Sequence, residues 1–175
     1  MWAEKSFLII GGSSGIGLEV VRKLVERGSS VTVWSRTLTE ELGKLGITHH
    51  SVDVTGDTED APLPEQLDGV GYFPGSINLA PFERIKTEVF RQDLEVNLLG
   101  AVRVLQRTVP VMARSGGGSV VMVSTVAVRT GMSYHASVAA AKGAVEGLSK
   151  SLAAEYAAKR VRFNVIAPSL TDTPM

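Results

Sequence analysis

The sequence contains no cysteine, and this absence removes several kinds of chemistry at once. Without thiols the 175-residue chain has no disulfides, thiolate metal sites or cysteine nucleophile. No apolar stretch approaches the roughly 20 residues that a transmembrane helix requires. Basic and acidic residues number 18 each, so the formal net charge is zero. This balance predicts no nucleic-acid partner and no anionic membrane surface as a partner.

Length and composition indicate one ordinary globular domain. Hydrophobic residues make up 44% of the chain and charged residues 21%, which is a usual mix for a soluble protein. The first apolar run begins at Phe7, so we expect no signal peptide ahead of it. We therefore expect a single domain over residues 1–175, located in the cytoplasm.

Apolar runs suited to buried strands alternate with runs of helical periodicity. We expect helices from Leu18 onward, over 87–114, where Thr87 is able to cap the helix, and over 133–159. The stretch 56–68 is rich in Pro, Asp and Glu and predicts a loop. This alternation predicts an α/β fold with a Rossmann-like, doubly wound parallel sheet and helices on both faces. The expected strands are 7–10, 30–34, 48–54, 70–73, 119–123 and 161–167.

A glycine-rich turn stands between the first expected strand and the first expected helix. Because glycine lacks a Cβ atom, backbone N–H groups can approach a diphosphate, and the helix N-terminus presents further donors. The two serine hydroxyls can add donors. A tight turn without a ligand is the alternative, but the strand–turn–helix context favours a dinucleotide site. The turn consists of Gly11, Gly12, Ser13, Ser14, Gly15, Ile16 and Gly17.

Candidate polar segments follow the other expected strands as well. In sheets of this type, ligands bind beyond the carboxyl ends of the strands, at the point where strand order reverses. We therefore expect these segments to gather at one edge of the sheet. They are Ser35-Arg36-Thr37, Asp53-Val54, Pro74-Gly75, Ser124-Thr125 and residues 168–173, which begin with Pro168 and end with Thr173.

The order and spacing of these motifs resemble the short-chain dehydrogenase/reductase family over essentially the whole chain. The resemblance implies an oxidoreductase that acts on a small-molecule carbonyl or secondary alcohol with a nicotinamide cofactor. It further implies that the glycine turn, the Asp53-Val54 pair at the adenine ring, Pro74-Gly75, Pro168 and Thr173 contact the cofactor. The matching motifs are the glycine turn, Asp53-Val54, Asn97 with Gly100, Ser124-Thr125, Lys142-Gly143-Ala144, and Asn164 with Pro168.

Several positions depart from the family pattern. The family's Asn-Asn-Ala-Gly after the fourth strand is replaced by Tyr72-Phe73-Pro74-Gly75. Pro168 is followed by Ser169 where the family has glycine. The position of the catalytic tyrosine, four residues before Lys142, is occupied by Val138. The family also usually has a further helix pair and a last strand that cover the substrate, and we expect these to be absent from residues 1–175.

The end of the second strand predicts which nicotinamide cofactor is bound. An NAD-preferring site places Asp or Glu there to accept hydrogen bonds from the ribose hydroxyls. This chain has Ser35 at that position, followed by Arg36. A guanidinium can pair with a 2′-phosphate in a bidentate way, and the hydroxyls of Ser35 and Thr37 can add donors. A solvated loop arginine is the alternative, but we predict NADP(H).

The catalytic roles that the resemblance implies are only partly filled. Thr125, with its neighbour Ser124, can supply the hydroxyl that polarises a carbonyl. Asn97 would hold a water in a proton relay, and Lys142 would bind the nicotinamide ribose. Val138, however, cannot donate the proton that the developing alkoxide needs.

Two substitutes for the missing acid lie just before Lys142. At 100° per residue on a helix, His135 falls within about 20° of the lysine's face, whereas Tyr134 is about 80° away. Histidine, with an ordinary pKa near 6.5, is a suitable acid at neutral pH. The alternative for His135 is a helix-start histidine that packs or faces water, and the alternative for Tyr134 is an amphipathic residue at the edge of the dimer or the pocket. We interpret His49 and His50 as surface residues without a metal.

Two classes of function remain open. Asn97, the hydroxyl pair and Lys142 favour an NADP(H)-dependent oxidoreductase with an altered proton donor. The missing tyrosine favours a catalytically silent nucleotide-binding protein with a regulatory or assembly role. A fragment that lacks its substrate lid is a third possibility.

The two long helices predict a homodimer or homotetramer, because they carry excess apolar surface. The candidates for this surface are Val102, Leu105, Leu148 and Leu152.

Overall fold

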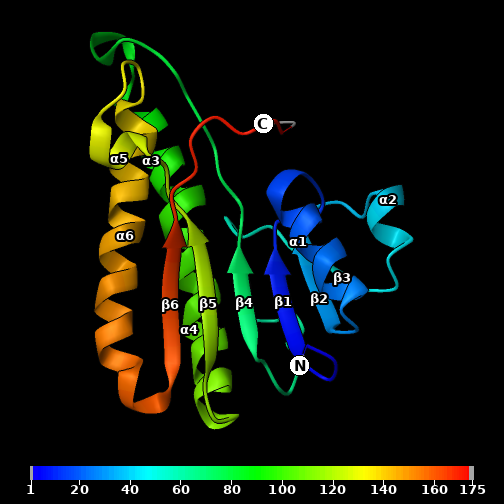
Figure 1. The fold of residues 1–175 in the computed structure, drawn as a ribbon. Helices are drawn as coiled ribbons and strands as arrows, with labels where there is room; N and C mark the ends of the chain where they lie inside the picture. The colour runs from blue at the N-terminus through cyan, green and yellow to red at the C-terminus, as the bar shows by residue number, and fades with distance from the viewer. Residues whose placement is uncertain (1, 174–175) are drawn as a thin grey trace.

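The structure is a computed structural model that describes residues 2–173. Within these residues six parallel strands form one sheet in the order β3-β2-β1-β4-β5-β6 (Figure 1). The chain runs outward from β1 to β3 and then returns to the other side of β1, which makes the sheet doubly wound, as predicted. The strands are β1 Ser6–Ile10, β2 Ser30–Ser35, β3 Thr48–Ser51, β4 Gly69–Tyr72, β5 Gly118–Val123 and β6 Val161–Ile166.

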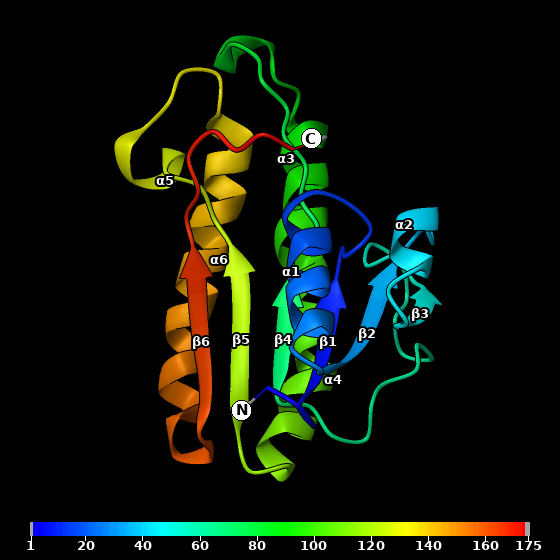
Figure 2. The ribbon, with the colours of Figure 1, turned by 45° about the vertical axis from the view of Figure 1, so that its right-hand side comes forward.

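Helices cover the two faces of the sheet (Figures 1 and 2). The helix α1, Gly15–Glu26, buries Leu18, Val21 and Leu24 against one face. The helices α4, Gly100–Arg114, and α6, Ala136–Tyr156, pack on the other face in the larger core. The shorter helices are α2 Glu40–Gly43, α3 Thr87–Leu94, α5 Ala127–Thr130, and the 3₁₀ segments η1 Phe82–Arg84 and η3 Ala157–Lys159.

The expected helix over 87–114 is interrupted. A π-helical turn, η2 at Glu95–Leu99, separates α3 from α4. Turns of this kind are frequent at functional sites. The residue that caps α3 is Lys86, without a side-chain cap, so the prediction that Thr87 is the cap was wrong. The expected helix over 133–159 begins as α6 at Ala136 and ends as the 3₁₀ turn η3.

The predicted excess of apolar surface on the two long helices is smaller than expected. Leu105 belongs to the core, with 3% of its surface exposed, so its assignment to an outer face was wrong. Val102, Leu148 and Leu152 are half-buried. In the described part of the chain, no helix combines the length and apolar character needed to cross a membrane.

Candidate active site

The strand registers align the predicted site residues at one edge of the sheet. Ile10 at the end of β1 lies beside Trp34 of β2 and Tyr72 of β4. The three strands therefore end side by side, and the residues that follow them begin at the same edge of the sheet. The Gly11 N–H donates to the Trp34 carbonyl over 2.8 Å, and the Phe73 N–H donates to the Ile10 carbonyl over 3.0 Å. These bonds place the glycine turn between the ends of β2 and β4, where the strand order reverses.

The glycine turn leaves space that side chains at its glycine positions would occupy. Gly11 has a φ of +74° and Gly15 a φ of +54°, which few residues other than glycine adopt. A Cβ atom on Gly17 would lie 2.2 Å from the Gly11 carbonyl oxygen. The N-cap Ser14 makes no side-chain capping bond. The backbone therefore comes close enough for a diphosphate at the start of α1, so these residues fit a dinucleotide.

The end of β4 touches this turn directly. A Cβ atom on Gly11 would lie 2.9 Å from the backbone nitrogen of Pro74. The predicted Pro74-Gly75 segment therefore lies against the glycine turn, although its sequence differs from the family's. The structure brings together these two predicted parts of the cofactor site.

The end of β2 is organised differently from the prediction. Ser35 is buried, and its Oγ lies 3.0 Å from the Thr37 carbonyl oxygen and 3.0 Å from His49 Nε2. The hydroxyl therefore donates to Thr37 and accepts from the imidazole, which leaves no hydrogen for a phosphate. His49 consequently supports this loop, and Arg36 and Thr37 remain as polar residues exposed beside Ser35.

Arg36 and Asp53 lie within electrostatic reach of each other. Hydrogen bonds from the backbone and side chain of Thr55 lower the pKa of Asp53; burial opposes this effect, and the Arg36 guanidinium adds to it. Asp53 therefore carries its charge at neutral pH on the same side of the sheet as Arg36. Val54, the second predicted adenine residue, is instead buried in the core.

Asn97 lies in the π turn, at the centre of a buried polar cluster. Its Nδ2 donates to the Asp93 carbonyl over 2.8 Å and to Ser76 Oγ over 3.2 Å, while its Oδ1 has no partner. Asp93 Oδ1 accepts from Ser76 Oγ over 2.6 Å and from Asn78 Nδ2 over 2.9 Å. The cluster joins the segment after β4 to the end of α3.

Ser124 and Thr125 differ in what their hydroxyls do. Ser124, with 2% of its surface exposed, donates its hydroxyl hydrogen to Glu146 Oε1 over 2.7 Å. Thr125 Oγ1 accepts from the Ala127 N–H over 3.3 Å and so keeps its own hydrogen. Of the two predicted hydroxyls, Thr125 is therefore the one that can donate to a carbonyl oxygen.

Val138 and Lys142 stand one turn apart on α6, and both are buried. Their exposed fractions are 5% and 7%. Burial lowers the pKa of Lys142 to about 8, against the opposing attraction of the Asp93 carboxylate. The lysine is therefore an ammonium group in a buried environment. One turn before it, Val138 places an aliphatic side chain where the family has the phenol of tyrosine.

The helical projection used for His135 does not hold, because α6 begins one residue later. His135 is the N-cap residue, and Tyr134 before it has a φ of +67°. The His135 ring is partly exposed, and its Nδ1 donates to the Ser133 carbonyl over 2.7 Å. This bond leaves Nε2 as the ring nitrogen that can face a ligand.

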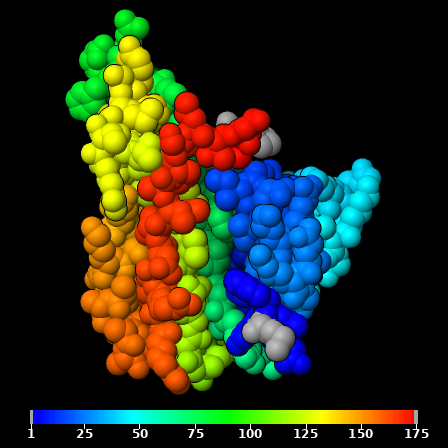
Figure 3. Space-filling view, in the orientation of Figure 1, coloured from blue at the N-terminus to red at the C-terminus, as the bar shows by residue number. Residues whose placement is uncertain are grey.

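The segment after β6 crosses the carboxyl end of the sheet toward α1 (Figure 3). The Ser124 N–H donates to the Ile166 carbonyl over 2.7 Å, and the Val126 N–H donates to the Pro168 carbonyl over 3.2 Å. Pro168 is thereby tied to the loop that carries Thr125. Thr173 is the last described residue of this segment.

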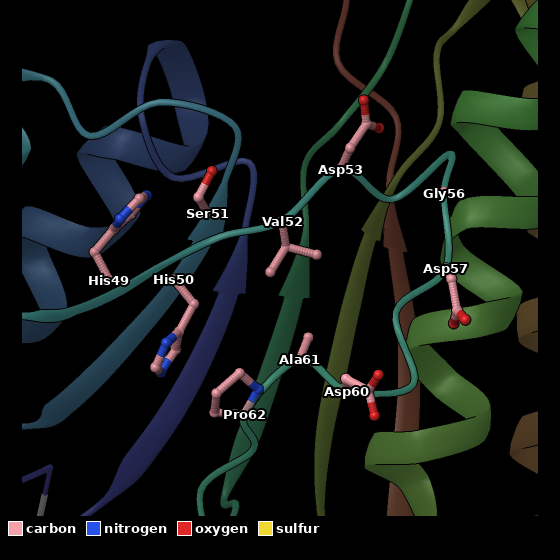
Figure 4. A pocket seen from close by; sticks show the side chains of 10 residues that line it. All are labelled: His49, His50, Ser51, Val52, Asp53, Gly56, Asp57, Asp60, Ala61 and Pro62. Atoms are coloured by element: carbon pink, nitrogen blue, oxygen red, sulfur yellow. The ribbon is translucent and has the colours of Figure 1, made fainter.

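A separate pocket of about 510 Å³ lies beside the outer strand β3 and the loop that follows it (Figure 4). His50, Asp57, Asp60 and Pro62 are among its lining residues, and Asp53 is the only predicted site residue in the lining. In residues 2–173 no three His, Asp or Glu side chains come together as metal ligands. We assign no function to this pocket.

Four residues of the site were missed in the sequence: Ser76, Asn78, Asp93 and Glu146. Asp93 precedes Asn97 by four residues, and this spacing on a helix was a usable signal that both share a face. Ser76 and Asn78 lie in a loop without periodicity, and Glu146 is one of the charged residues spaced along α6. No local pattern distinguishes these three.

Comparisons with known proteins agree with this arrangement. The family model described as short chain dehydrogenase matches residues 5–175. The human 3-oxoacyl-[acyl-carrier-protein] reductase is 32% identical over 98% of this chain and 78% of its own length. Cis-4-hydroxycyclohexanecarboxylate dehydrogenase from Sinomonas cyclohexanicum is 28% identical over 99% of this chain and 76% of its own.

Solved structures show the same fold. The ligand-free aldohexose dehydrogenase from Thermoplasma acidophilum has a TM-score of 0.87 at 26% identity, covering 99% of this chain and 69% of that one. The matched sequence, the reversed strand order and the glycine turn at the reversal lead to one assignment. The chain belongs to the short-chain dehydrogenase/reductase family of oxidoreductases.

Proposed function

We propose that this chain is a cytoplasmic NADP(H)-dependent oxidoreductase that interconverts a carbonyl and a secondary alcohol. The observation that carries the proposal is the buried, unpartnered Oδ1 of Asn97 close to the end of β4. A buried amide oxygen without a partner costs about 1–3 kcal/mol, so its retention favours a role toward a bound water or ligand. A protein that only binds a nucleotide has no need of this group.

Each residue of the site has a separate role in the proposed reaction. A nicotinamide cofactor held by the glycine turn would supply or accept the hydride. Thr125 donates a hydrogen bond to the substrate oxygen and thereby polarises the carbonyl. The Lys142 ammonium holds the nicotinamide ribose and stabilises negative charge nearby. Asn97 fixes a water through its Oδ1, and His135 at the start of α6 is our candidate for the proton donor.

NADPH should bind more tightly than NADH, because Arg36 meets the 2′-phosphate without an acidic residue at the end of β2. Arg36→Ala should weaken NADPH binding by about 1.5–3 kcal/mol, the range for a hydrogen bond to a charged group, and leave NADH nearly unchanged. Cofactor fluorescence titrations of both proteins measure this. Equal affinities for both cofactors in the unmutated protein would contradict the proposal.

If His135 is the acid, it donates the proton that the developing alkoxide needs during carbonyl reduction. His135→Ala should then lower the rate of reduction by roughly 10²–10⁴-fold, the usual contribution of a positioned general acid. Tyr134→Phe is the matched control. If neither variant changes the NADPH oxidation rate on any carbonyl of a panel, the acid lies elsewhere.

We also propose that the chain forms a homodimer or homotetramer through α4 and α6. The half-buried side chain of Val102, which is not part of the core cluster, supports this arrangement, whereas Leu148 and Leu152 pack partly against the sheet core. Light scattering at micromolar concentration should give a mass of two or four chains. A monomer at that concentration would contradict the assignment.

A further inference from the structure

The fold buries two charged residues among those it describes, Asp93 and Lys142. Asp93 has no exposed surface, and Lys142 has 7%. An ionised carboxylate that is buried alone is very unfavourable, so charges of this kind are retained beside a partner of opposite sign. The two residues lie on α3 and α6, which pack against each other.

Hydrogen bonds satisfy only one of the two oxygen atoms of the Asp93 carboxylate. Oδ1 accepts from Ser76 and Asn78, which would serve equally well to anchor a loop on a neutral amide. Oδ2 is buried and has no hydrogen-bond partner. A purely structural anchor does not require this second, charged oxygen, whereas the attraction between the carboxylate and the Lys142 ammonium across the packed helices α3 and α6 does.

Other charged groups around α6 are engaged elsewhere or exposed. On α3, Glu88 pairs with Arg91 at the surface, and in η2, Glu95 pairs with Arg103. On α6 itself, Glu146 accepts from Ser124. The remaining charged side chains on the elements packed against α6 are exposed: Arg129 of α5, Arg162 of β6 and Lys159 of η3.

We propose that Asp93 is a positioning residue, whose carboxylate holds Lys142 as an ammonium group from across the α3–α6 contact while its Oδ1 is bonded to the segment after β4. The attraction of Asp93 opposes the effect of burial on the pKa of Lys142. Without Asp93, burial alone acts, and the lysine loses its proton at lower pH. The role of this ammonium in turnover rests on the proposed function, but its charge state does not.

The charge state of Lys142 can be measured without cofactor or substrate. In protein labelled with ¹³C at lysine, the Cε shift of Lys142 reports its protonation, and the spectrum of Lys142→Met identifies the signal. Asp93→Asn keeps the size and one acceptor oxygen but removes the charge. We expect the Lys142 midpoint, about 8 in the unmutated protein, to move to lower pH in this variant. The exposed Lys150 on the same helix is the internal control and should not move.

A midpoint that stays in place in Asp93→Asn would overturn the proposal, even if the protein proves to be an active reductase. Conversely, a shifted midpoint in a protein without turnover would support this role of Asp93 and contradict the proposed oxidoreductase function. In an active protein, the alkaline limit of the rate should move to lower pH together with the midpoint.

Thermal unfolding keeps the proposal testable if Asp93→Asn alone does not fold. Lys142→Met leaves the buried carboxylate without its partner, so it should unfold at lower temperature than the unmutated protein. Adding Asp93→Asn should then raise the unfolding temperature, because the unpaired charge is gone. If instead Asp93→Asn lowers it equally in both backgrounds, Asp93 acts only as a loop anchor and the proposal fails.

Discussion

Lys142→Ala should abolish turnover, and Val138→Tyr should raise it by roughly 10²–10⁴-fold, the usual contribution of a positioned general acid. Val138 and Lys142 are one helical turn apart and both buried. A phenol introduced at position 138 therefore stands beside the ammonium, which lowers the pKa of a neighbouring acid. Rates of NADPH oxidation against a panel of carbonyls measure both effects.

The gain from Val138→Tyr comes with a loss of stability. The valine is 5% exposed, so a larger ring must displace its neighbours, at about 1–3 kcal/mol for overpacking. Val138→Phe is the matched control, because it adds the same ring without the hydroxyl. If the tyrosine and phenylalanine variants have equal rates while NADPH still binds, a silent nucleotide-binding protein becomes the better interpretation.

Gly17→Ala should weaken NADPH binding by at least about tenfold, which corresponds to about 1.4 kcal/mol. The new Cβ atom would lie 2.2 Å from the Gly11 carbonyl oxygen, so the turn must open or α1 must shift. Either movement changes the backbone geometry of the glycine turn, to which we assign the diphosphate. Fluorescence titration measures the affinity, and the thermal unfolding midpoint should fall in the same variant.

Gly147→Ala is the control for this substitution. Gly147 lies in the middle of α6, and a Cβ atom there meets nothing within 4 Å. Alanine is favoured over glycine in a helix interior by about 0.8–1.0 kcal/mol, so this variant should be slightly more stable and bind NADPH normally. Unchanged NADPH affinity in Gly17→Ala would show that the glycine turn does not bind the cofactor.

The largest difference between prediction and structure concerns the groups around Asn97. Asn97 itself was recognised from its spacing to Gly100, but the π turn that carries it was not. A π turn depends on how α3 and α4 pack, and the local sequence still has ordinary helical periodicity. Asp93 was passed over for a similar reason, since its partners Ser76 and Asn78 are 17 and 15 residues away in the chain.

The site on α6 gives a second example. The sequence places Val138 one turn before Lys142, and the structure shows that both are buried. It also led us to extend the helix through His135, whereas the backbone of Tyr134 turns into the left-handed region and the helix begins at Ala136. A helix boundary of this kind is decided by contacts such as the bond from the Ala80 N–H to the Tyr134 carbonyl.

By itself the sequence determined the alternation of strands and helices, the glycine turn and the family, because each depends on short-range periodicity or on close spacing of glycines. Tertiary structure alone decided which hydroxyl and which charges remain available for chemistry. Ser124 and Thr125 are neighbours of nearly equal chemistry, yet Glu146 engages only the first. Such differences arise because long-range hydrogen bonds and burial depend on which distant residues the fold brings within a few ångströms.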